Sequence, residues 1–167
     1  MSSSKTVLFY GWILRGLTRV KTIEKGLIDN GWKVKECVEW RVEGLWDAKK
    51  LRLAYDFLKI YFSLLFRFLR YKDYDVILIH HFGLPFVPFI KLCNLTKRKI
   101  IVLDSYILLT DTYMDRCKSN KIIRSFLSII ENICFSMVDF VLVDTMENLK
   151  TIKYQKKGIV IYNGAGT

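Results

Sequence analysis

The sequence predicts an α/β fold, with a doubly wound, mainly parallel sheet and helices on both faces. Three observations lead to this prediction. Short apolar runs of strand length alternate along the chain with segments of helical periodicity. Most of these runs are nearly uninterrupted by polar residues, as in strands that helices cover on both sides. Glycine or polar residues follow the runs, at the points where such strands end.

The expected strands are placed by the apolar runs. The run Val7-Leu8-Phe9-Tyr10 is ended by Gly11, and the segment from Trp32 to Val38 alternates apolar and polar residues. The residues before the first strand lack the apolar stretch and cleavage site of a signal peptide. We expect six strands, at residues 7–10, 32–38, 75–79, 99–103, 140–143 and 158–162.

The segments between the strands have the spacing of helices. The first, Thr18 to Asn30, has Val20, Ile23 and Leu27 on one face and is followed by Gly31, the position of a C-cap glycine. The others are expected at residues 49–70, 84–95, 122–138 and 146–154. Strands and helices in this order predict one Rossmann-like domain over residues 1–167.

The composition excludes some classes of function. The net charge of +11 indicates an anionic partner. The four cysteines have no CxxC spacing and the two histidines are adjacent, so no structural metal site is expected. The cysteines lie in or beside apolar runs, which favours free thiols in a reducing cytosol. The basic residues form no known nucleic-acid-reading motif, so we expect no nucleic-acid partner and keep a basic nucleic-acid-binding domain only as an alternative.

Candidate ligand-binding residues follow from the sheet, because ligands bind beyond the carboxyl ends of parallel strands. After the first strand come Gly11, Trp12, Arg15, Gly16 and Arg19. A glycine-bearing turn that opens a helix, with two arginines beside it, suits a phosphate group. The loop lacks a GxGxxG pattern, which disfavours a dinucleotide, and no cofactor is expected. The alternative is a plain turn with exposed arginines.

The third strand is followed by His80, His81 and Gly83. Adjacent residues on an extended strand point to opposite faces, so at most one histidine is expected to face the cleft. Either histidine could supply hydrogen-bonding or acid–base chemistry. The alternative is that one histidine packs in the core and the other bonds to a loop.

The segment from Asp104 to Arg116 holds three carboxylates and one arginine between a strand and a helix. Asp104 ends the fourth strand, the position of a catalytic base or a hydrogen-bond acceptor, and Asp111 is a second candidate for contact with a ligand. The alternative for Asp111 and Asp115 is local, as helix caps and an ion pair with Arg116.

The order of these features resembles the N-terminal domain of family 4 glycosyltransferases, which have the GT-B fold. The resemblance covers nearly the whole chain, although many members have histidine where Asp104 stands. The first strand and its loop fit the family pattern. So do three later runs: Asp104-Ser105 to Asp115-Arg116, Val138 to Thr145, and Ile159 to Ala165.

The resemblance implies the acceptor-binding half of a retaining enzyme that transfers a sugar from a nucleotide sugar to a lipid-linked or polysaccharide acceptor. The nucleotide sugar would bind mainly to a C-terminal domain, which lies in the native chain beyond these residues or on a second polypeptide. Residues 1–167 alone are therefore expected to be inactive. In this interpretation Asp104 is the catalytic candidate, and the glycines, Trp12, arginines, histidines and Asp111 named above contact the acceptor.

The helix expected at residues 49–70 has more apolar surface than one sheet face needs. Its polar residues form a narrow stripe, in which Arg52, Lys59, Arg67 and Arg70 are basic. An anionic membrane surface is one expected partner, with the protein peripheral on the cytoplasmic face. A neighbouring helix or a second copy is the alternative. A non-catalytic, membrane-anchoring subunit of a two-chain glycosyltransferase is the second functional hypothesis.

Overall fold

We analysed a computed structural model of the chain, which describes residues 4–14, 17–41, 50–106, 108, 110 and 121–162. The sheet consists of β1 (Thr6–Leu14), β2 (Lys33–Arg41), β3 (Val76–Ile79), β4 (Ile100–Asp104), β5 (Phe140–Val143) and β6 (Gly158–Val160). The α-helices are α1 (Thr18–Asp29), α2 (Lys50–Arg70), α3 (Val87–Lys97), α5 (Lys121–Met137) and α6 (Met146–Thr151). Two 3₁₀ helices, η1 (His81–Phe86) and η2 (Gln155–Lys157), complete the described elements.

The six strands form one sheet in the order β2-β1-β3-β4-β5-β6, and all neighbouring pairs are parallel. This confirms the doubly wound, Rossmann-like α/β fold. The chain moves from β1 to β2 on one side and then returns to place β3 on the other side of β1. The sheet therefore has its topological switch point between β1 and β3, where ligands bind in open α/β sheets.

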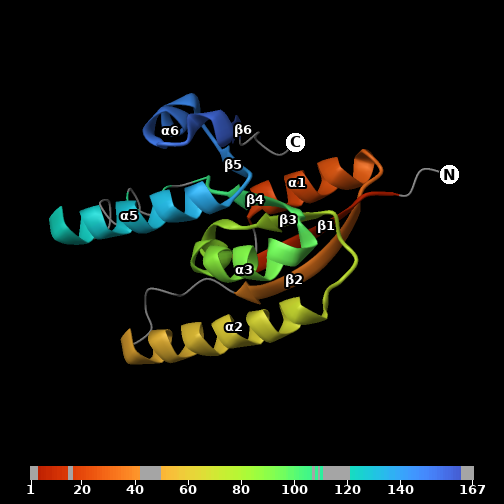
Figure 1. The fold of residues 1–167 in the computed structure, drawn as a ribbon, viewed down its shortest axis with the longest axis horizontal. Helices are drawn as coiled ribbons and strands as arrows, with labels where there is room; N and C mark the ends of the chain where they lie inside the picture. The colour runs from red at the N-terminus through yellow and green to blue at the C-terminus, as the bar shows by residue number, and fades with distance from the viewer. Residues whose placement is uncertain are drawn as a thin grey trace.

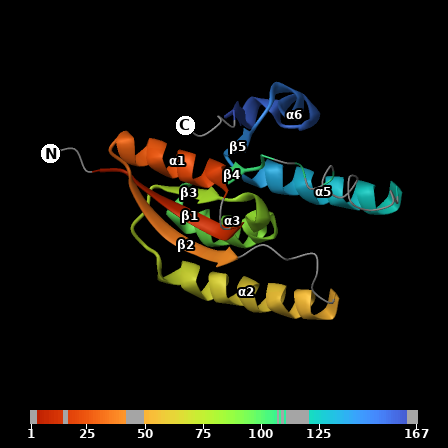
Figure 2. The same ribbon diagram turned by 180° about the vertical axis from the view of Figure 1, so that it is seen from behind.

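Helices cover the two faces of the sheet unequally (Figures 1 and 2). On one face, α1 packs Val20 against Val7, Phe9 and Ile13 of β1. On the other face, α2, α3 and α5 lie over a larger core to which all six strands contribute. Its centre includes Leu8, Tyr10, Leu64, Phe68, Ile77, Phe86, Ile101 and Phe135. Aromatic edges meet there, with the ring centroids of Tyr10 and Phe68 5.3 Å apart.

Several expected element boundaries were wrong: the helix expected at residues 146–154 ends at Thr151, and the last strand ends at Val160. Gly11 does not end the first strand, because β2 continues to offer backbone partners and β1 pairs with it up to Leu14 and Arg41. The segment after β3 begins as the 3₁₀ helix η1 before α3 starts at Val87. The C-cap glycine was correct: Gly31 has φ +77° and its N–H donates to the Ile28 carbonyl at 2.9 Å.

Within the residues that the structure describes, no helix combines the length and the apolar character that crossing a membrane requires. The helix α2 has 21 residues, but charged side chains interrupt its apolar sequence.

Candidate functional site

The site begins where β1 and β3 separate. Their pairing ends at Tyr10 and Ile79, while β1 continues along β2 alone. Beyond this point Gly11, at φ +124°, and Gly83 bring their backbones together. A Cβ atom on Gly11 would lie 3.3 Å from the Gly83 Cα, and the Gly83 N–H donates to the His80 carbonyl at 2.6 Å. Both predicted glycines are thus required by close backbone packing at the switch point.

A buried ion pair lies next to this point, between the start of α1 and the end of β4. The Nε and Nη2 atoms of Arg19 are each 2.9 Å from Oδ1 of Asp104. The side chains are 5% and 2% exposed, respectively. Arg19 Nη1 also donates to the carbonyl of Ile161 at 2.7 Å, so one guanidinium joins α1, β4 and the residue after β6.

His80 and Tyr106 complete this group. His80 Nδ1 lies 3.8 Å from Oδ2 of Asp104, and the His80 ring packs edge-on against Phe9, with centroids 4.9 Å apart. The Tyr106 ring lies 5.9 Å from the Arg19 guanidinium carbon. Burial, and then the Asp104 carboxylate, raise the pKa of the Tyr106 hydroxyl. We call Arg19, His80, Asp104 and Tyr106 the switch-point cluster.

The switch-point cluster leaves almost no free space. The cavity beside it has a volume of about 10 Å³. That volume holds roughly one water molecule at most. Trp12 also lines this cavity and is 4% exposed. The cluster can therefore position the surrounding backbone, but a sugar does not fit inside it in this conformation.

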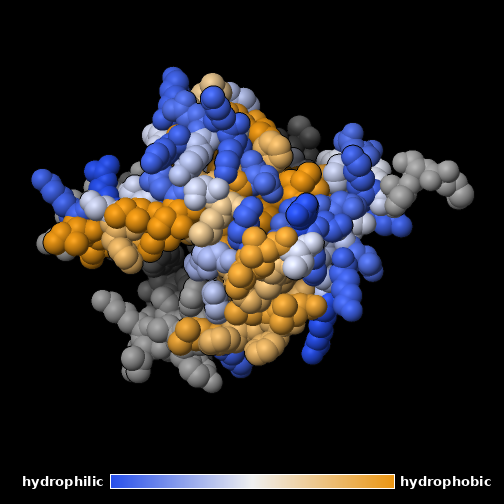
Figure 3. Space-filling model, in the orientation of Figure 1, coloured by the Kyte–Doolittle hydropathy of each residue, from blue (hydrophilic) through white to orange (hydrophobic). Residues whose placement is uncertain are grey.

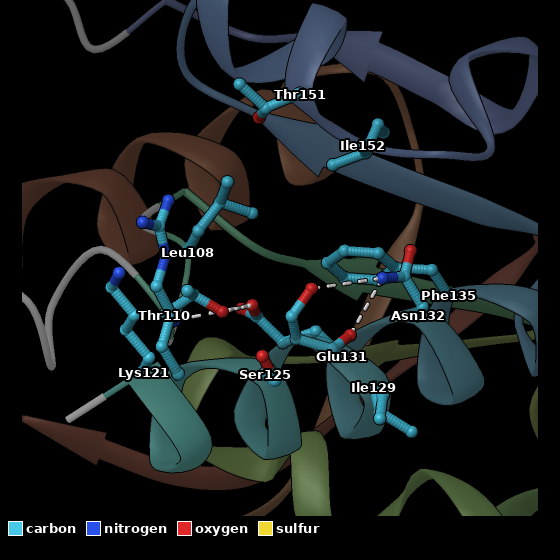
Figure 4. A pocket seen from close by; sticks show the side chains of 12 residues that line it. Leu108, Thr110, Lys121, Ser125, Ile129, Glu131, Asn132, Phe135, Thr151 and Ile152 are labelled. Atoms are coloured by element: carbon cyan, nitrogen blue, oxygen red, sulfur yellow. Dashed lines mark hydrogen bonds between the residues drawn. The ribbon is translucent and has the colours of Figure 1, made fainter.

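A much larger cavity, of about 680 Å³, lies between α5 and α6 (Figure 4). The chain leaving β4 connects it to the switch-point cluster, because Tyr106 belongs to the cluster and Leu108 and Thr110 line the cavity. We call this cavity the α5 pocket. Its described lining is Leu108, Thr110, Lys121, Arg124, Ser125, Ser128, Ile129, Glu131, Asn132, Phe135, Thr151 and Ile152.

Hydrogen bonds fix part of the lining of the α5 pocket, as the dashed lines in Figure 4 show. The backbone N–H and the hydroxyl of Thr110 both donate to the buried Glu131 carboxylate. Asn132 Nδ2 donates to the Ser128 carbonyl at 2.8 Å. These bonds hold the end of the 104–110 segment on α5 and orient polar groups around the pocket.

The remaining lining defines what the α5 pocket could bind. Ser125, Ser128 and Thr151 offer hydroxyl groups, which both donate and accept hydrogen bonds. Lys121 and Arg124 are exposed at the N-terminal end of α5 and offer positive charge. Apolar side chains form the rest of the wall. Hydroxyl, amide and cationic groups around an apolar wall suit a polyhydroxylated ligand that carries an anionic group.

The structure brings six predicted residues together around the switch point: Gly11, Trp12, Arg19, His80, Gly83 and Asp104. Arg19 differs from the expectation, because its guanidinium points inward to Asp104 and Ile161. His81 opens η1, but its side chain is not among the described ones. Arg15, Gly16 and Asp111 lie outside the described residues. Contact with an acceptor stays a prediction for every predicted site residue.

The basic residues expected to face a membrane have different surroundings. Lys59 and Arg70 are exposed. Arg67 Nη1 lies 3.0 Å from Oε2 of Glu39 on β2, so this arginine turns toward the sheet edge. The side chain of Arg52 is not among the described ones.

The sequence prediction missed the α5 pocket. A signal was present, because Lys121, Ser125, Ser128 and Asn132 are spaced 4, 3 and 4 residues apart along a helix whose other residues are mainly apolar. Such spacing places polar side chains on one face. No group of three or more metal-ligating side chains lies together in the part of the chain that the structure describes.

Comparison with known proteins adds no assignment. No family model matches the chain, and no curated protein matches it either.

Proposed function

We propose that this chain is the acceptor-binding half of a retaining glycosyltransferase, which transfers a sugar from a nucleotide sugar to a lipid-linked or polysaccharide acceptor. The observation that carries the proposal is the α5 pocket, where hydroxyl, amide and cationic groups surround a cavity of about 680 Å³. This volume lies in the range of small-molecule sites, roughly 300–1,000 Å³. The resemblance to family 4 glycosyltransferases supports the same function.

The acceptor would enter from the carboxyl side of the sheet. The N-terminal end of α5 extends past the carboxyl ends of β1 and β2 (Figure 1), and it carries Lys121 and Arg124. These two cations would bind a phosphate of a lipid-linked or phosphorylated glycan, while the hydroxyl groups deeper in the pocket would bind the sugar. The nucleotide sugar would bind to a second domain facing this edge.

In this proposal the chain contributes positioning. Transfer requires that an acceptor hydroxyl be held close to the donor carbon, and an oriented acceptor contributes much of the rate. Asp104 is 2% exposed and already bonded to Arg19, so we assign it the role of a positioning residue that fixes the 104–110 segment. That segment ends at Thr110 on the pocket wall.

Ligand-observed NMR with the full chain tests the proposal. Short-chain prenyl diphosphate saccharides should bind, and nucleotide sugars should bind much more weakly. The double substitution Lys121→Ala/Arg124→Ala should weaken saccharide binding by about tenfold or more, because two charge-assisted contacts are lost. Lys25→Ala, an exposed lysine on α1, is the matched control and should have no effect. Tight nucleotide-sugar binding in the α5 pocket, or no saccharide binding, would contradict the proposal.

A second candidate is a membrane-anchoring subunit without a catalytic role. It is favoured by the exposed apolar side chains on the outer side of α2 and α5. The two functions predict different results in the same NMR experiment, because an anchoring subunit has no need to bind saccharides in the α5 pocket.

A further inference from the structure

The helix α2 has apolar side chains on both of its sides. Leu64 and Phe68 face the sheet and are fully buried. On the outer side, Leu58, Phe62, Phe66 and Leu69 are each at least 53% exposed and are spaced 4, 4 and 3 residues apart. A helix that covers one sheet face normally places polar residues on its outer side. Packing in the protein core therefore does not account for the apolar side chains of this outer stripe.

The helix α5 repeats the pattern. Its outer stripe contains Ile122, Phe126 and Ile133, which are 46–79% exposed. The polar side chains of α5 line the α5 pocket on a different side of the helix. Between α2 and α5, the helix α3 exposes Leu92 and Leu95 at 66% and 62%.

These stripes belong to one face of the molecule. The helices α2, α3 and α5 form a single layer, in which Phe68 of α2 meets Phe89 of α3 and α3 packs against α5. Figure 3 looks onto this layer and shows apolar colour over all three helices. We call this surface the outer face of the helix layer. Exposed apolar side chains on three neighbouring helices mark a contact with another apolar phase or molecule.

The charges of the three helices indicate what covers this face. Among the exposed side chains that the structure describes on these helices, four are basic and none is acidic; the basic ones are Lys59, Arg70, Lys121 and Arg124. Glu131 is buried and bonded to Thr110, so it does not offset the positive charge at the surface. The exposed Lys59 and Arg70 lie beside the α2 stripe.

This charge pattern argues against a second copy of the chain. A symmetric dimer through this face would bring two positively charged surfaces together. An anionic lipid surface suits both kinds of side chain on this face. Its acyl region accepts the apolar side chains, and its phosphates attract the basic ones. We infer that the outer face of the helix layer docks the protein on an anionic membrane, with α2, α3 and α5 lying in the plane of the interface.

This inference does not depend on the glycosyltransferase proposal, because docking requires neither a glycan nor a nucleotide, and it names the surface that an anchoring subunit would use. It also involves three helices rather than the single α2 segment that the sequence indicated. Docking in this orientation would place the N-terminal end of α5, with Lys121 and Arg124, at the level of the lipid phosphates.

Vesicle flotation with the full chain tests the inference. Vesicles of phosphatidylcholine mixed with phosphatidylglycerol should carry the protein upward at low salt, and vesicles of phosphatidylcholine alone should not. Raising the ionic strength should release the protein, since salt screens the attraction between lysines and phosphates. Failure of the wild type to float with the anionic vesicles at low salt would overturn the inference, as would equal binding to both kinds of vesicle.

Matched substitutions locate the surface. Phe62→Gln/Phe66→Gln on α2 and Phe126→Gln/Ile133→Gln on α5 should each weaken anionic-vesicle binding by about tenfold or more. Ile28→Gln on α1 is the apolar control, because Ile28 is 53% exposed on the opposite side of the sheet. If the control weakens binding as much as the α2 and α5 variants do, the inferred surface is wrong.

The basic residues are tested in the same way. Lys59→Ala/Arg70→Ala should weaken binding by about fivefold per residue removed. Lys25→Ala on α1 is the charged control and should leave binding unchanged. Equal losses per charge removed would show that net charge alone drives association, which would overturn docking through this face.

Two measurements separate docking from misfolding and from self-association. Hydrogen exchange of the wild type should slow in α2, α3 and α5, but not in α1, when anionic vesicles are added. This result needs no variant. Light scattering without lipid should show a monomer. If the wild type instead forms a dimer that the glutamine substitutions dissociate, a second copy covers the face and the inference is overturned.

Discussion

Arg19 and Asp104 are 85 residues apart in the sequence and form a buried ion pair that joins the first helix to the end of the fourth strand. The pair lies beside the switch point, between the α1 layer and the carboxyl edge of the sheet. The further bond from Arg19 to the Ile161 carbonyl ties the last described residues to the same point. One arginine thus fixes three parts of the chain around the candidate site.

Removing one partner of this pair should destabilise the protein strongly. Arg19→Met leaves the Asp104 carboxylate buried without its cation, and we expect a loss of about 3–5 kcal/mol in the free energy of unfolding. The double substitution Arg19→Met/Asp104→Leu should recover much of the loss, because no unpaired charge remains. Urea unfolding measures both. The exposed pair of Arg67 and Glu39 is the control, and Arg67→Ala should cost at most about 1 kcal/mol.

An equal loss in the single and double variants would contradict this account. It would show that packing around Arg19, rather than an uncompensated charge, determines the effect. Rescue by the double variant would support the assignment of Arg19 and Asp104 as positioning residues.

The glycine pair at the switch point should tolerate no side chain. A Cβ on Gly83 would lie 2.6 Å from Cγ2 of the fully buried Ile79, and Gly11 combines φ +124° with a 3.3 Å approach to Gly83. We expect Gly83→Ala and Gly11→Ala each to lower the free energy of unfolding by about 1–3 kcal/mol.

Gly26 supplies the matched control for these substitutions. It lies within α1, and a Cβ there would meet nothing within 4 Å. Gly26→Ala should raise the free energy of unfolding by up to about 1 kcal/mol, because alanine favours the helix. Chemical denaturation of the three variants compares them directly, and a stabilised Gly83→Ala variant would show that the backbones at the switch point can separate.

The order of strands and helices could be predicted from the sequence. Each strand is a nearly continuous apolar run, and each helix has apolar residues at helical spacing. The sequence also located His80 and Asp104 at strand ends, since a polar residue there interrupts the apolar pattern. The extension of β1 to Leu14 could not be predicted, because it depends on the backbone partners that β2 supplies up to Arg41.

The contacts within the site were not accessible to the same reasoning. Arg19 and Asp104 were separate candidates, and only the packing of α1 over the end of β4 brings them into contact. The polar spacing on α5 was visible in the sequence. The polar face of α5 turns toward α6 and so forms the α5 pocket. This orientation depends on the order of β4, β5 and β6 in the sheet.

Two buried thiols should make the stability depend on pH above neutrality. Cys37 and Cys134 are 0% and 2% exposed, and burial raises the pKa of each thiol from 9.0 to about 11. The folded state thus binds these protons more tightly than the unfolded state. Their contribution to stability is complete below about pH 9 and is lost as the pH rises from about 9 to 11.

Urea unfolding at several pH values measures this loss. Each thiol should contribute up to about 3 kcal/mol over that interval. The Cys37→Ala/Cys134→Ala variant should show a flatter decline over the same interval, even if it is less stable throughout. An identical slope in the variant and the wild type would assign the decline to other groups.

Lys157 should stabilise the C-terminal end of α5. Its Nζ donates to the carbonyls of Ser136 and Val138, each at 2.8 Å, and reaches that of Phe135 at 3.5 Å. The last carbonyls of a helix lack partners within the helix and lie at the negative end of its dipole, so a cation there is favourable. We expect Lys157→Ala to lower the free energy of unfolding by about 1–2 kcal/mol.

Hydrogen exchange resolves this effect along the chain. In the Lys157→Ala variant, amides in the last turns of α5 should exchange faster, while those of α1 should keep the wild-type rate. Lys156→Ala is the matched control, because Lys156 is exposed and no hydrogen bond from its side chain is found among the described residues.

The α5 helix lines the α5 pocket and carries one apolar stripe of the outer face, so loosening its end should weaken saccharide and vesicle binding together. Unchanged exchange in α5 would show that packing against α3 alone holds the helix in place.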